Sequence, residues 1–267
     1  MRILIMGASG YLGGTIYKKL KQHGRDEIYG TCCRGENPEF IKANVLDKSD
    51  IKRVLLFEPD VIIWSILEKE QGELITETGV KYIIDNASKD VRFIYVSTTV
   101  GQGKDQTEEV IPHKRHSEEY LSEYVNGKIK GESIVSRHDN HVIVRPGNIY
   151  GYDYDGNMDN RMKQLMEVWK SGKEYSRTAN MYASFVNVQE LSDAIIELAY
   201  GKFTGTLNIA SENPVSHYVF NKYLANLMNI DSGFIIADYR EKDEYHNLSG
   251  DKRRNVLSTE IRDMDKY

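Results

Sequence analysis

The sequence has few features of a secreted, membrane-spanning or disulfide-stapled protein. Only two of its 267 residues are cysteines, the adjacent Cys32 and Cys33, so we expect free thiols in a reducing compartment. No apolar run approaches the length that crosses a bilayer, and residues 1–6 lead directly into a glycine motif without room for a signal peptide. We therefore expect a cytoplasmic protein that does not contact a membrane.

The chain also lacks an excess of basic residues. It carries 35 lysines and arginines against 40 aspartates and glutamates, a formal net charge of −5. This balance gives no broad positive field for a phosphate backbone, so we do not expect nucleic acid as a partner. The hydrophobic fraction of 40% and charged fraction of 28% are ordinary for a globular protein long enough to bury a sizeable core.

Short, β-rich apolar runs alternate with longer segments of helical periodicity along the first half of the chain. This alternation is typical of a parallel sheet covered by helices on both faces, and it predicts an α/β, Rossmann-like, doubly wound fold. The predicted strands are residues 3–6, 27–31, 61–64, 93–96 and 142–144. The predicted helices are residues 13–22, 49–57, 78–87 and 118–135.

The rhythm changes after Gly151, where a loop rich in Asp, Asn, Gly and Tyr begins. The later predicted elements are helices near 162–170, 189–200 and 219–228, and strands at 184–188 and 206–209. We expect the chain to return to the main sheet at 206–209. The sequence thus predicts a Rossmann domain of residues 1–150 plus about 181–210, and a smaller C-terminal substrate lobe of about 151–180 plus 211–267.

A glycine motif, Gly7-Ala8-Ser9-Gly10-Tyr11-Leu12-Gly13, follows the first predicted strand and opens the first predicted helix. In this context glycines allow a tight turn, close approach of a pyrophosphate to the backbone, and close packing of the helix on the strand. Free N–H groups and the helix dipole then hold the phosphates. A glycine turn without a ligand is the alternative. The predicted cofactor-binding residues here are Gly7, Ser9, Gly10, Tyr11, Leu12 and Gly13.

The end of the second predicted strand is where the adenosine ribose of a dinucleotide is expected, and an acidic residue there favours NAD. This sequence instead has Arg34, whose guanidinium suits a 2′-phosphate, so we predict NADP as the cofactor, with NAD as the alternative. A solvated loop residue is the other interpretation of Arg34. Asn44 and Val45 are candidates for the adenine site, while Asp47 either joins that site or caps the next helix.

Tyr124 and Lys128 are four residues apart in a predicted helix and therefore share one face. A phenol with a pKa of about 10 exchanges protons at neutral pH only when cationic neighbours favour the phenolate. Lys128 and an oxidised nicotinamide would supply that charge, so we predict an acid–base role for Tyr124. Because the chain has 18 tyrosines, the alternative is that Tyr124 and Lys128 are an ordinary surface pair on a helix. Their position along the chain argues against this alternative.

Four ordered motifs make nearly the whole chain resemble the extended short-chain dehydrogenase/reductase family, which includes epimerases and dehydratases. The closest resemblance is to nucleotide-sugar 4-keto reductases of the dTDP-4-dehydrorhamnose reductase kind. The motifs are the glycine turn, Tyr95-Val96-Ser97-Thr98-Thr99, Tyr124 and Lys128 with Gly131-Glu132, and Arg145-Pro146-Gly147-Asn148-Ile149-Tyr150-Gly151.

The resemblance implies a role for residues in each motif. A hydroxyl after the central strand, Thr98 first and Thr99 as the alternative, binds the substrate oxygen. Tyr124 transfers the proton, and Lys128 also holds the nicotinamide ribose. Pro146 and Asn148 approach the nicotinamide.

The implied reaction is hydride transfer from NADPH to a keto group on a nucleotide-activated deoxysugar, with Tyr124 as proton donor. Thr99-Val100 replaces the acidic pair that follows the catalytic threonine of dehydratases, which argues against dehydration. Epimerisation with tightly bound NAD(P) and a non-catalytic NAD(P)-binding sensor stay open. The family also makes a homodimer possible. The candidates for a substrate diphosphate are Arg161, Arg177 and Arg254.

Two features of the sequence are not interpreted as parts of a cofactor or metal site. Trp64-Ser65-Ile66-Leu67 stands where the family has a small, Ala-rich segment, and Trp64 is interpreted as a packing residue rather than a cofactor stacker. His113 and His116 have no cysteine or carboxylate at ligand spacing, so we expect no metal site.

Overall fold

The computed structural model describes residues 1–35, 37–101 and 103–264. The chain divides into two compact units. The first unit comprises Met1–Val100, Ile111–Arg145 and Ser192–Leu207. The second comprises Gly101–Val110, Pro146–Leu191 and Asn208–Tyr267, of which residues 102 and 265–267 lie outside the described part. The predicted boundaries place residues 101–110, 146–150, 181–191 and 208–210 with the Rossmann domain, whereas this division assigns them to the second unit.

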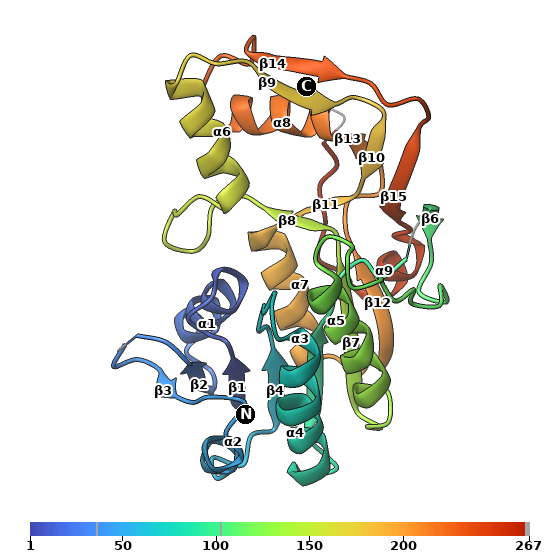
Figure 1. Cartoon of the computed structure of the whole chain (residues 1–267). Coiled ribbons are helices and arrows are strands. Elements are labelled where there is room, and N and C mark those ends of the chain that lie inside the picture. The colour runs from blue at the N-terminus through green and yellow to red at the C-terminus, as the bar shows by residue number, and fades with distance from the viewer. Residues whose placement is uncertain (36, 102, 265–267) are drawn as a thin grey trace. The chain divides into compact units, whose positions relative to one another are not determined.

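A seven-stranded sheet with the order β12, β7, β5, β4, β1, β2, β3 organises the first unit (Figure 1). Its strands are β1 (Arg2–Met6), β2 (Glu27–Cys32), β3 (Ile41–Lys42), β4 (Val61–Trp64), β5 (Arg92–Val96), β7 (His141–Pro146) and β12 (Gly205–Ile209). The pairings from β3 through β7 are parallel. This order confirms the predicted Rossmann-like sheet, including the return of the chain at β12.

The helices of this part of the chain are α1 (Tyr11–His23), α2 (Lys48–Leu55), α3 (Gly72–Ile75), a π-helical turn η1 (Thr76–Val80), α4 (Lys81–Asn86), α5 (Ser122–Val135) and α7 (Val188–Tyr200). Asp47 caps α2, because its side chain accepts a hydrogen bond from the Ser49 N–H at 2.8 Å. The capping alternative for Asp47 is therefore confirmed. Trp64 is 2% exposed in the core between the sheet and these helices, which confirms its packing role.

The described residues of the second unit form short strands and three helices. The strands are β6 (Gly103–Gln106), β8 (Asn148–Tyr150), β9 (Tyr175–Thr178), β10 (Met181–Ala183), β11 (Phe185–Asn187), β13 (Val215–Ser216), β14 (Ile235–Asp238) and β15 (Glu244–Leu248). The helices are α6 (Asn160–Lys170), α8 (His217–Leu227) and α9 (Asp251–Val256). They enclose a core that includes Tyr150, Phe185 and Phe220.

The strand predicted at 184–188 does not join the main sheet. It forms β11, which pairs in parallel with β8 in a separate two-stranded sheet. The remaining strands of the second unit form the sheet β13, β10, β15, β6 and the pair β14, β9. No helix among the described residues has both the length and the apolar character needed to cross a bilayer.

Candidate active site

The glycine motif forms the turn between β1 and α1, beside the point where the sheet order reverses. Gly7 has a φ of 89°, and its N–H donates to the Thr31 hydroxyl at 3.1 Å. The Gly10 N–H donates back to the Gly7 carbonyl at 3.0 Å, which closes the turn. In doubly wound sheets, ligands bind in the crevice at this switch point.

Gly13 has no space for a side chain. A Cβ at this position would lie 2.5 Å from the Ser65 hydroxyl and 2.9 Å from the Gly7 carbonyl carbon. Ser65 is itself held by its Oγ, which donates to the Met6 carbonyl at 3.0 Å. The predicted close packing of α1 on β1 is therefore present, whereas the supporting hydroxyls of Thr31 and Ser65 were not foreseen.

The turn fits the pyrophosphate of a dinucleotide. Gly10 caps the 13-residue α1 without a side chain that would occupy the first N–H groups. Ser9 and Gly10 are exposed, and the first turn carries no acidic residue. Free N–H groups at the positive end of a helix dipole stabilise phosphate oxygens.

Arg34 lies just beyond the end of β2, as the predicted ribose site requires. Its side chain is 93% exposed, and its guanidinium lies 3.9 Å from the Glu68 carboxylate. At this distance and exposure the ion pair is weak, so a 2′-phosphate can compete with Glu68 for the guanidinium.

The predicted adenine-site residues have local structural roles. The Asn44 side-chain oxygen accepts a hydrogen bond from the Leu46 N–H at 3.0 Å, and the Asn44 N–H donates to Asp50 at 2.9 Å. Val45 is 6% exposed and belongs to the core of the first unit. Neither observation tests a contact with adenine, so that role stays a prediction.

Thr98, Tyr124 and Lys128 are brought together within the first unit. Thr98 follows the end of β5, and its side chain is hydrogen-bonded to Tyr124 near the start of α5. The Lys128 ammonium lies 5.8 Å from the centre of the Tyr124 ring, and both residues line one pocket. Among the two candidate threonines, this geometry favours Thr98.

Two backbone carbonyls hold the Lys128 ammonium. Nζ donates to the Ile66 carbonyl at 2.9 Å and to the Val96 carbonyl at 2.7 Å, and one N–H remains for a ribose hydroxyl. Burial lowers the pKa of Lys128 to about 7, although the Glu132 carboxylate opposes that change. These acceptors are main-chain groups, so no residue type in the sequence could reveal them.

The pKa of Tyr124 is raised in this structure, whereas the sequence prediction relied on Lys128 together with an oxidised nicotinamide to favour the phenolate. Burial raises the pKa of Tyr124, and only the hydrogen bond with Thr98 acts in the opposite direction. Desolvation dominates because the Tyr124 ring is partly buried among apolar side chains and the Lys128 ammonium donates to carbonyls instead of the phenol. A phenol with a raised pKa remains protonated at neutral pH, which suits a proton donor.

The lowered pKa of Lys128 predicts a specific pH dependence of stability. Between pH 7 and pH 10 the unfolded chain keeps the Lys128 proton that the folded chain has released, so the free energy of unfolding rises with pH. The contribution is at most about 1.4 kcal/mol per pH unit. Lys128→Met should remove this rise, measured by denaturant unfolding at several pH values. If the free energy of unfolding rose equally with pH in the wild type and in Lys128→Met, the lowered pKa of the buried Lys128 would be contradicted.

Close glycine contacts place α5 against its neighbours. A Cβ at Gly72 would lie 3.2 Å from the Tyr124 Cα, and one at Gly127 would lie 2.8 Å from the Glu73 nitrogen. The Thr76 hydroxyl donates to the Gly127 carbonyl at 3.0 Å. The helix that carries Tyr124 and Lys128 is therefore fixed by backbone-to-backbone packing, which small residues alone permit.

The predicted residues Asn148 and Arg161 meet in the second unit. Arg161 donates to the Ile149 carbonyl at 2.6 Å and to the Asn148 side-chain oxygen at 3.3 Å. The Asn148 amide also donates to the Ser184 carbonyl at 3.3 Å. Pro146 ends β7, at the start of the same unit. The predicted nicotinamide contacts of Pro146 and Asn148 are not tested by this geometry.

The other two candidate arginines differ in their surroundings. The Arg177 guanidinium lies 3.7 Å from the centre of the Tyr175 ring, and its buried Nε has no hydrogen-bond partner among the described residues. Arg254 instead pairs with Glu212 at 2.6 Å and with Asp251. Arg177 therefore retains hydrogen-bonding capacity for an anion, whereas the charge of Arg254 is already compensated.

His217, at the start of α8, marks an electropositive region of the second unit. Burial, together with the positive charges of Arg161, Arg177, His246 and Arg240, lowers its pKa to about 4. The His217 ring packs edge-on against Phe185 with ring centres 5.9 Å apart. These positive groups come from positions far apart in the chain, so no local sequence pattern indicates the cluster.

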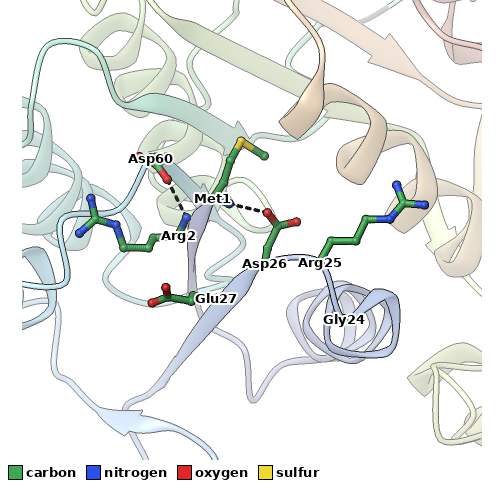
Figure 2. Close-up of a pocket in the computed structure, with 7 residues that line it drawn as sticks. All are labelled: Met1, Arg2, Gly24, Arg25, Asp26, Glu27 and Asp60. Carbon is green, nitrogen blue, oxygen red and sulfur yellow. Dashed lines mark hydrogen bonds and ion pairs between the residues drawn. The ribbon is translucent and has the colours of Figure 1, made fainter.

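A second hollow lies at the amino ends of β1 and β2, lined in part by Arg2, Asp26 and Asp60 (Figure 2). The Met1 ammonium pairs with Asp26 at 2.6 Å, and the Arg2 N–H donates to Asp60 at 2.7 Å. Ligands of α/β sheets bind at the carboxyl ends of the strands, and these contacts tie the strand starts together. In the part of the chain that the structure describes, no three His, Cys, Asp or Glu side chains form a metal-binding group.

A Rossmann-like sheet with a glycine turn, and a cluster of Thr98, Tyr124 and Lys128 in the same unit, define a protein of the extended short-chain dehydrogenase/reductase type. Within that class, the chain belongs to the family described as RmlD substrate binding domain, whose model matches residues 1–245.

Solved structures share the fold over almost the whole chain. WbmH from Bordetella bronchiseptica, in complex with NAD+, has a TM-score of 0.82 at 16% identity, covering 98% of this chain and 94% of that one. A hypothetical dTDP-4-dehydrorhamnose reductase from Sulfolobus tokodaii has a TM-score of 0.79 at 23% identity, covering 99% and 98%. The dTDP-4-dehydrorhamnose reductase from Bacillus anthracis, in complex with NADP, has a TM-score of 0.78 at 20% identity, covering 97% and 95%.

Curated relatives match a shorter part of the chain. Methionine adenosyltransferase 2 subunit beta from Danio rerio is 28% identical over 149 residues, which are 51% of this chain and 44% of the relative. The Bos taurus protein of the same name is 26% identical over 165 residues, 56% of this chain and 47% of the relative. The aligned part thus spans about half the length of these relatives.

Proposed function

We propose that the protein reduces a keto group on a nucleotide-activated deoxysugar, with NADPH as the reductant and Tyr124 as the proton donor. The observation that carries the proposal is the hydrogen bond between the Tyr124 and Thr98 side chains, with Tyr124 and Lys128 lining one pocket. The structural relatives named dTDP-4-dehydrorhamnose reductase, one of them in complex with NADP, support this substrate class and cofactor.

The chain's own residues have separate tasks in this reaction. When bound, the reduced nicotinamide supplies a hydride for the carbonyl carbon. Thr98 and Tyr124 bind the keto oxygen through their hydroxyls and stabilise the negative charge that develops on it. Tyr124, kept protonated by burial, donates its proton to that oxygen, and the nearby Lys128 ammonium stabilises the phenolate that remains.

A substrate screen tests the proposal directly. The protein is incubated with NADPH and a panel of nucleotide-linked 4-keto sugars, while nicotinamide absorbance is followed and the sugar product is identified. We expect oxidation of NADPH with formation of one alcohol per cofactor. An isomerised sugar without net consumption of cofactor would replace the proposal with epimerisation, an activity named for one structural neighbour of 17% identity.

The cofactor preference predicts a selective effect of Arg34→Ala. Loss of the guanidinium at the end of β2 should weaken NADPH binding roughly tenfold to a hundredfold, because a charge-assisted bond to the 2′-phosphate is lost. NADH binding should change far less. Titration calorimetry with both cofactors measures this, with the exposed Arg25→Ala as a matched control. Equal weakening of both cofactors would reject Arg34 as the selector.

The substrate diphosphate is proposed to bind Arg161 and Arg177 in the second unit. Arg177→Ala should raise the KM for the nucleotide sugar about tenfold or more, since its Nε offers a free N–H to phosphate oxygens. Arg254→Ala is the matched control and should leave KM nearly unchanged, because Glu212 and Asp251 already compensate that charge. Steady-state kinetics with varied sugar concentration measures the KM of each variant. Equal KM changes in both variants would reject the role of Arg177.

A second candidate function is a non-catalytic NAD(P)-binding subunit. The curated relatives are named as subunits of methionine adenosyltransferase, and two carbonyls already hold the Lys128 ammonium. Under this alternative the protein binds NADPH but oxidises it with none of the sugars. Turnover that Tyr124→Phe abolishes would exclude the alternative.

A further inference from the structure

A buried carboxylate joins three segments of the candidate active site. Glu132 Oε1 accepts hydrogen bonds from the Ser97 hydroxyl at 2.5 Å and from Arg145 Nε at 3.0 Å. Glu132 Oε2 accepts from the Arg145 terminal nitrogen at 2.7 Å. The side chains of Arg145 and Glu132 are only 6% and 7% exposed. All three residues belong to the first unit.

Each member of this cluster adjoins a residue with a proposed role. Ser97 directly precedes Thr98 at the end of β5, and Arg145 directly precedes Pro146 at the end of β7. Glu132 lies four residues after Lys128, and thus one turn further along the same face of α5. One carboxylate therefore ties the ends of two neighbouring strands to the helix that carries Tyr124 and Lys128.

If the Glu132 cluster only held β5, β7 and α5 together, its side chains would not need to be charged. A buried ion pair costs both partners their hydration, and apolar residues of similar volume often replace it without loss of stability. The charge of Glu132 has an additional consequence here, because Lys128, which is 6% exposed, lies one helical turn away. Its carboxylate favours the ammonium form of Lys128 against desolvation.

The remaining groups around Lys128 supply little net negative charge. The ring of Tyr95 from β5 lies 5.1 Å from Nζ, and the ring of Tyr124 from α5 lies 5.8 Å away. The Ile66 and Val96 carbonyls accept its hydrogen bonds. Glu68, between β4 and α3, lines the same pocket but also lies near Arg34.

We propose that Glu132 is a positioning residue for the reaction, which fixes Thr98 and α5 through Ser97 and Arg145 and places a carboxylate one helical turn from Lys128. The inference rests on the proposed function for its catalytic consequence. Its electrostatic part is independent of any cofactor or substrate.

The central test compares Glu132→Gln with the wild type in the pH dependence of unfolding, without cofactor. The amide keeps the size of the side chain and removes its charge. We expect the rise in stability that Lys128 causes to begin about one pH unit lower. In a Lys128→Met background, Glu132→Gln should produce no such displacement. This double-mutant comparison isolates the coupling between the two residues.

Activity provides a second measurement. The pH at which kcat falls on the alkaline side should move lower by about the same amount in Glu132→Gln, while KM for the sugar changes less than about threefold. Arg92→Met is the matched control. Arg92 is a buried arginine at the amino end of β5, where it donates to the Leu198 and Phe203 carbonyls. Loss of the Arg92 side chain should reduce stability without shifting the pH dependence of unfolding or of kcat.

Unchanged pH curves in Glu132→Gln, together with reduced stability, would overturn the proposal and leave a structural ion pair. If Glu132→Gln does not fold, the double variant E132M/R145M replaces it, since apolar substitution of both partners is commonly tolerated. A smaller displacement toward lower pH is expected there, because loss of the Arg145 charge offsets part of the effect of losing the Glu132 charge. Failure of the proposed function would appear separately, as turnover that survives Tyr124→Phe while the unfolding measurements still show the coupling.

Discussion

Replacing Tyr124 with phenylalanine is expected to lower kcat by about a thousandfold while NADPH affinity changes less than about threefold. The phenol is hydrogen-bonded to Thr98, and burial raises its pKa so that it stays protonated at neutral pH. Phenylalanine preserves the ring packing and removes only the hydroxyl. Stopped-flow or steady-state oxidation of NADPH measures turnover, and fluorescence titration measures affinity.

Tyr120→Phe is the matched control for this substitution. Tyr120 precedes α5 in the same unit, but its side chain is 80% exposed. The same loss of one hydroxyl should leave turnover unchanged there. Turnover by Tyr124→Phe within about tenfold of the wild type would remove Tyr124 from the proposed proton transfer.

Gly13→Ala should produce the largest loss of cofactor binding in the chain, at least about a hundredfold in affinity. The new Cβ would overlap the Gly7 carbonyl group and the Ser65 hydroxyl, so α1 must move away from the glycine turn. Overpacking of this kind costs about 1–3 kcal/mol of stability. Calorimetric titration with NADPH and denaturant unfolding measure the two effects.

Gly14→Ala is the adjacent control in the same helix. A Cβ at Gly14 meets only the Ala8 carbonyl oxygen, at 3.2 Å, and alanine favours helix by about 1 kcal/mol relative to glycine. We expect stability within about 1 kcal/mol of the wild type and unchanged cofactor affinity. Equal losses in Gly13→Ala and Gly14→Ala would contradict the close-packing account of the turn.

The central sheet was predictable because its strands are continuous apolar runs. The predicted strand at 61–64 coincides with β4, and the helices at 13–22 and 189–200 differ from α1 and α7 by only a few residues. Parallel strands buried on both faces must be almost wholly apolar, and that leaves a clear local pattern. The fold class followed from this pattern.

The strands of the second unit were largely missed because their pairing is not local. β6 pairs with β15, more than 130 residues later in the chain, and β10 pairs with both β13 and β15. Their sequences are short and polar, as in the Gly-Lys-Asp-Gln of β6. Such segments become strands through tertiary contacts rather than intrinsic propensity. This pairing also explains why residues 101–110 belong to the second unit.

The candidate site was likewise predictable from the sequence only in part. Thr98, Tyr124 and Lys128 carry recognisable chemistry at a fixed spacing, and the structure brings them together. The carbonyls that hold Lys128 and the glycine contacts of α5 belong to the backbone, so the sequence does not reveal them. The direction of the Tyr124 pKa depended on burial, which only the packed structure defines.

Transfer of a labelled hydride tests the central claim most directly. The protein is incubated with NADPH carrying deuterium at the transferring position and with each nucleotide-linked keto sugar, and the product is analysed by mass spectrometry and NMR. The account predicts one deuterium at the former keto carbon with the wild-type protein and almost none with Tyr124→Phe. Oxidation of NADPH without deuterium in the sugar, or equal labelling by both proteins, would contradict it.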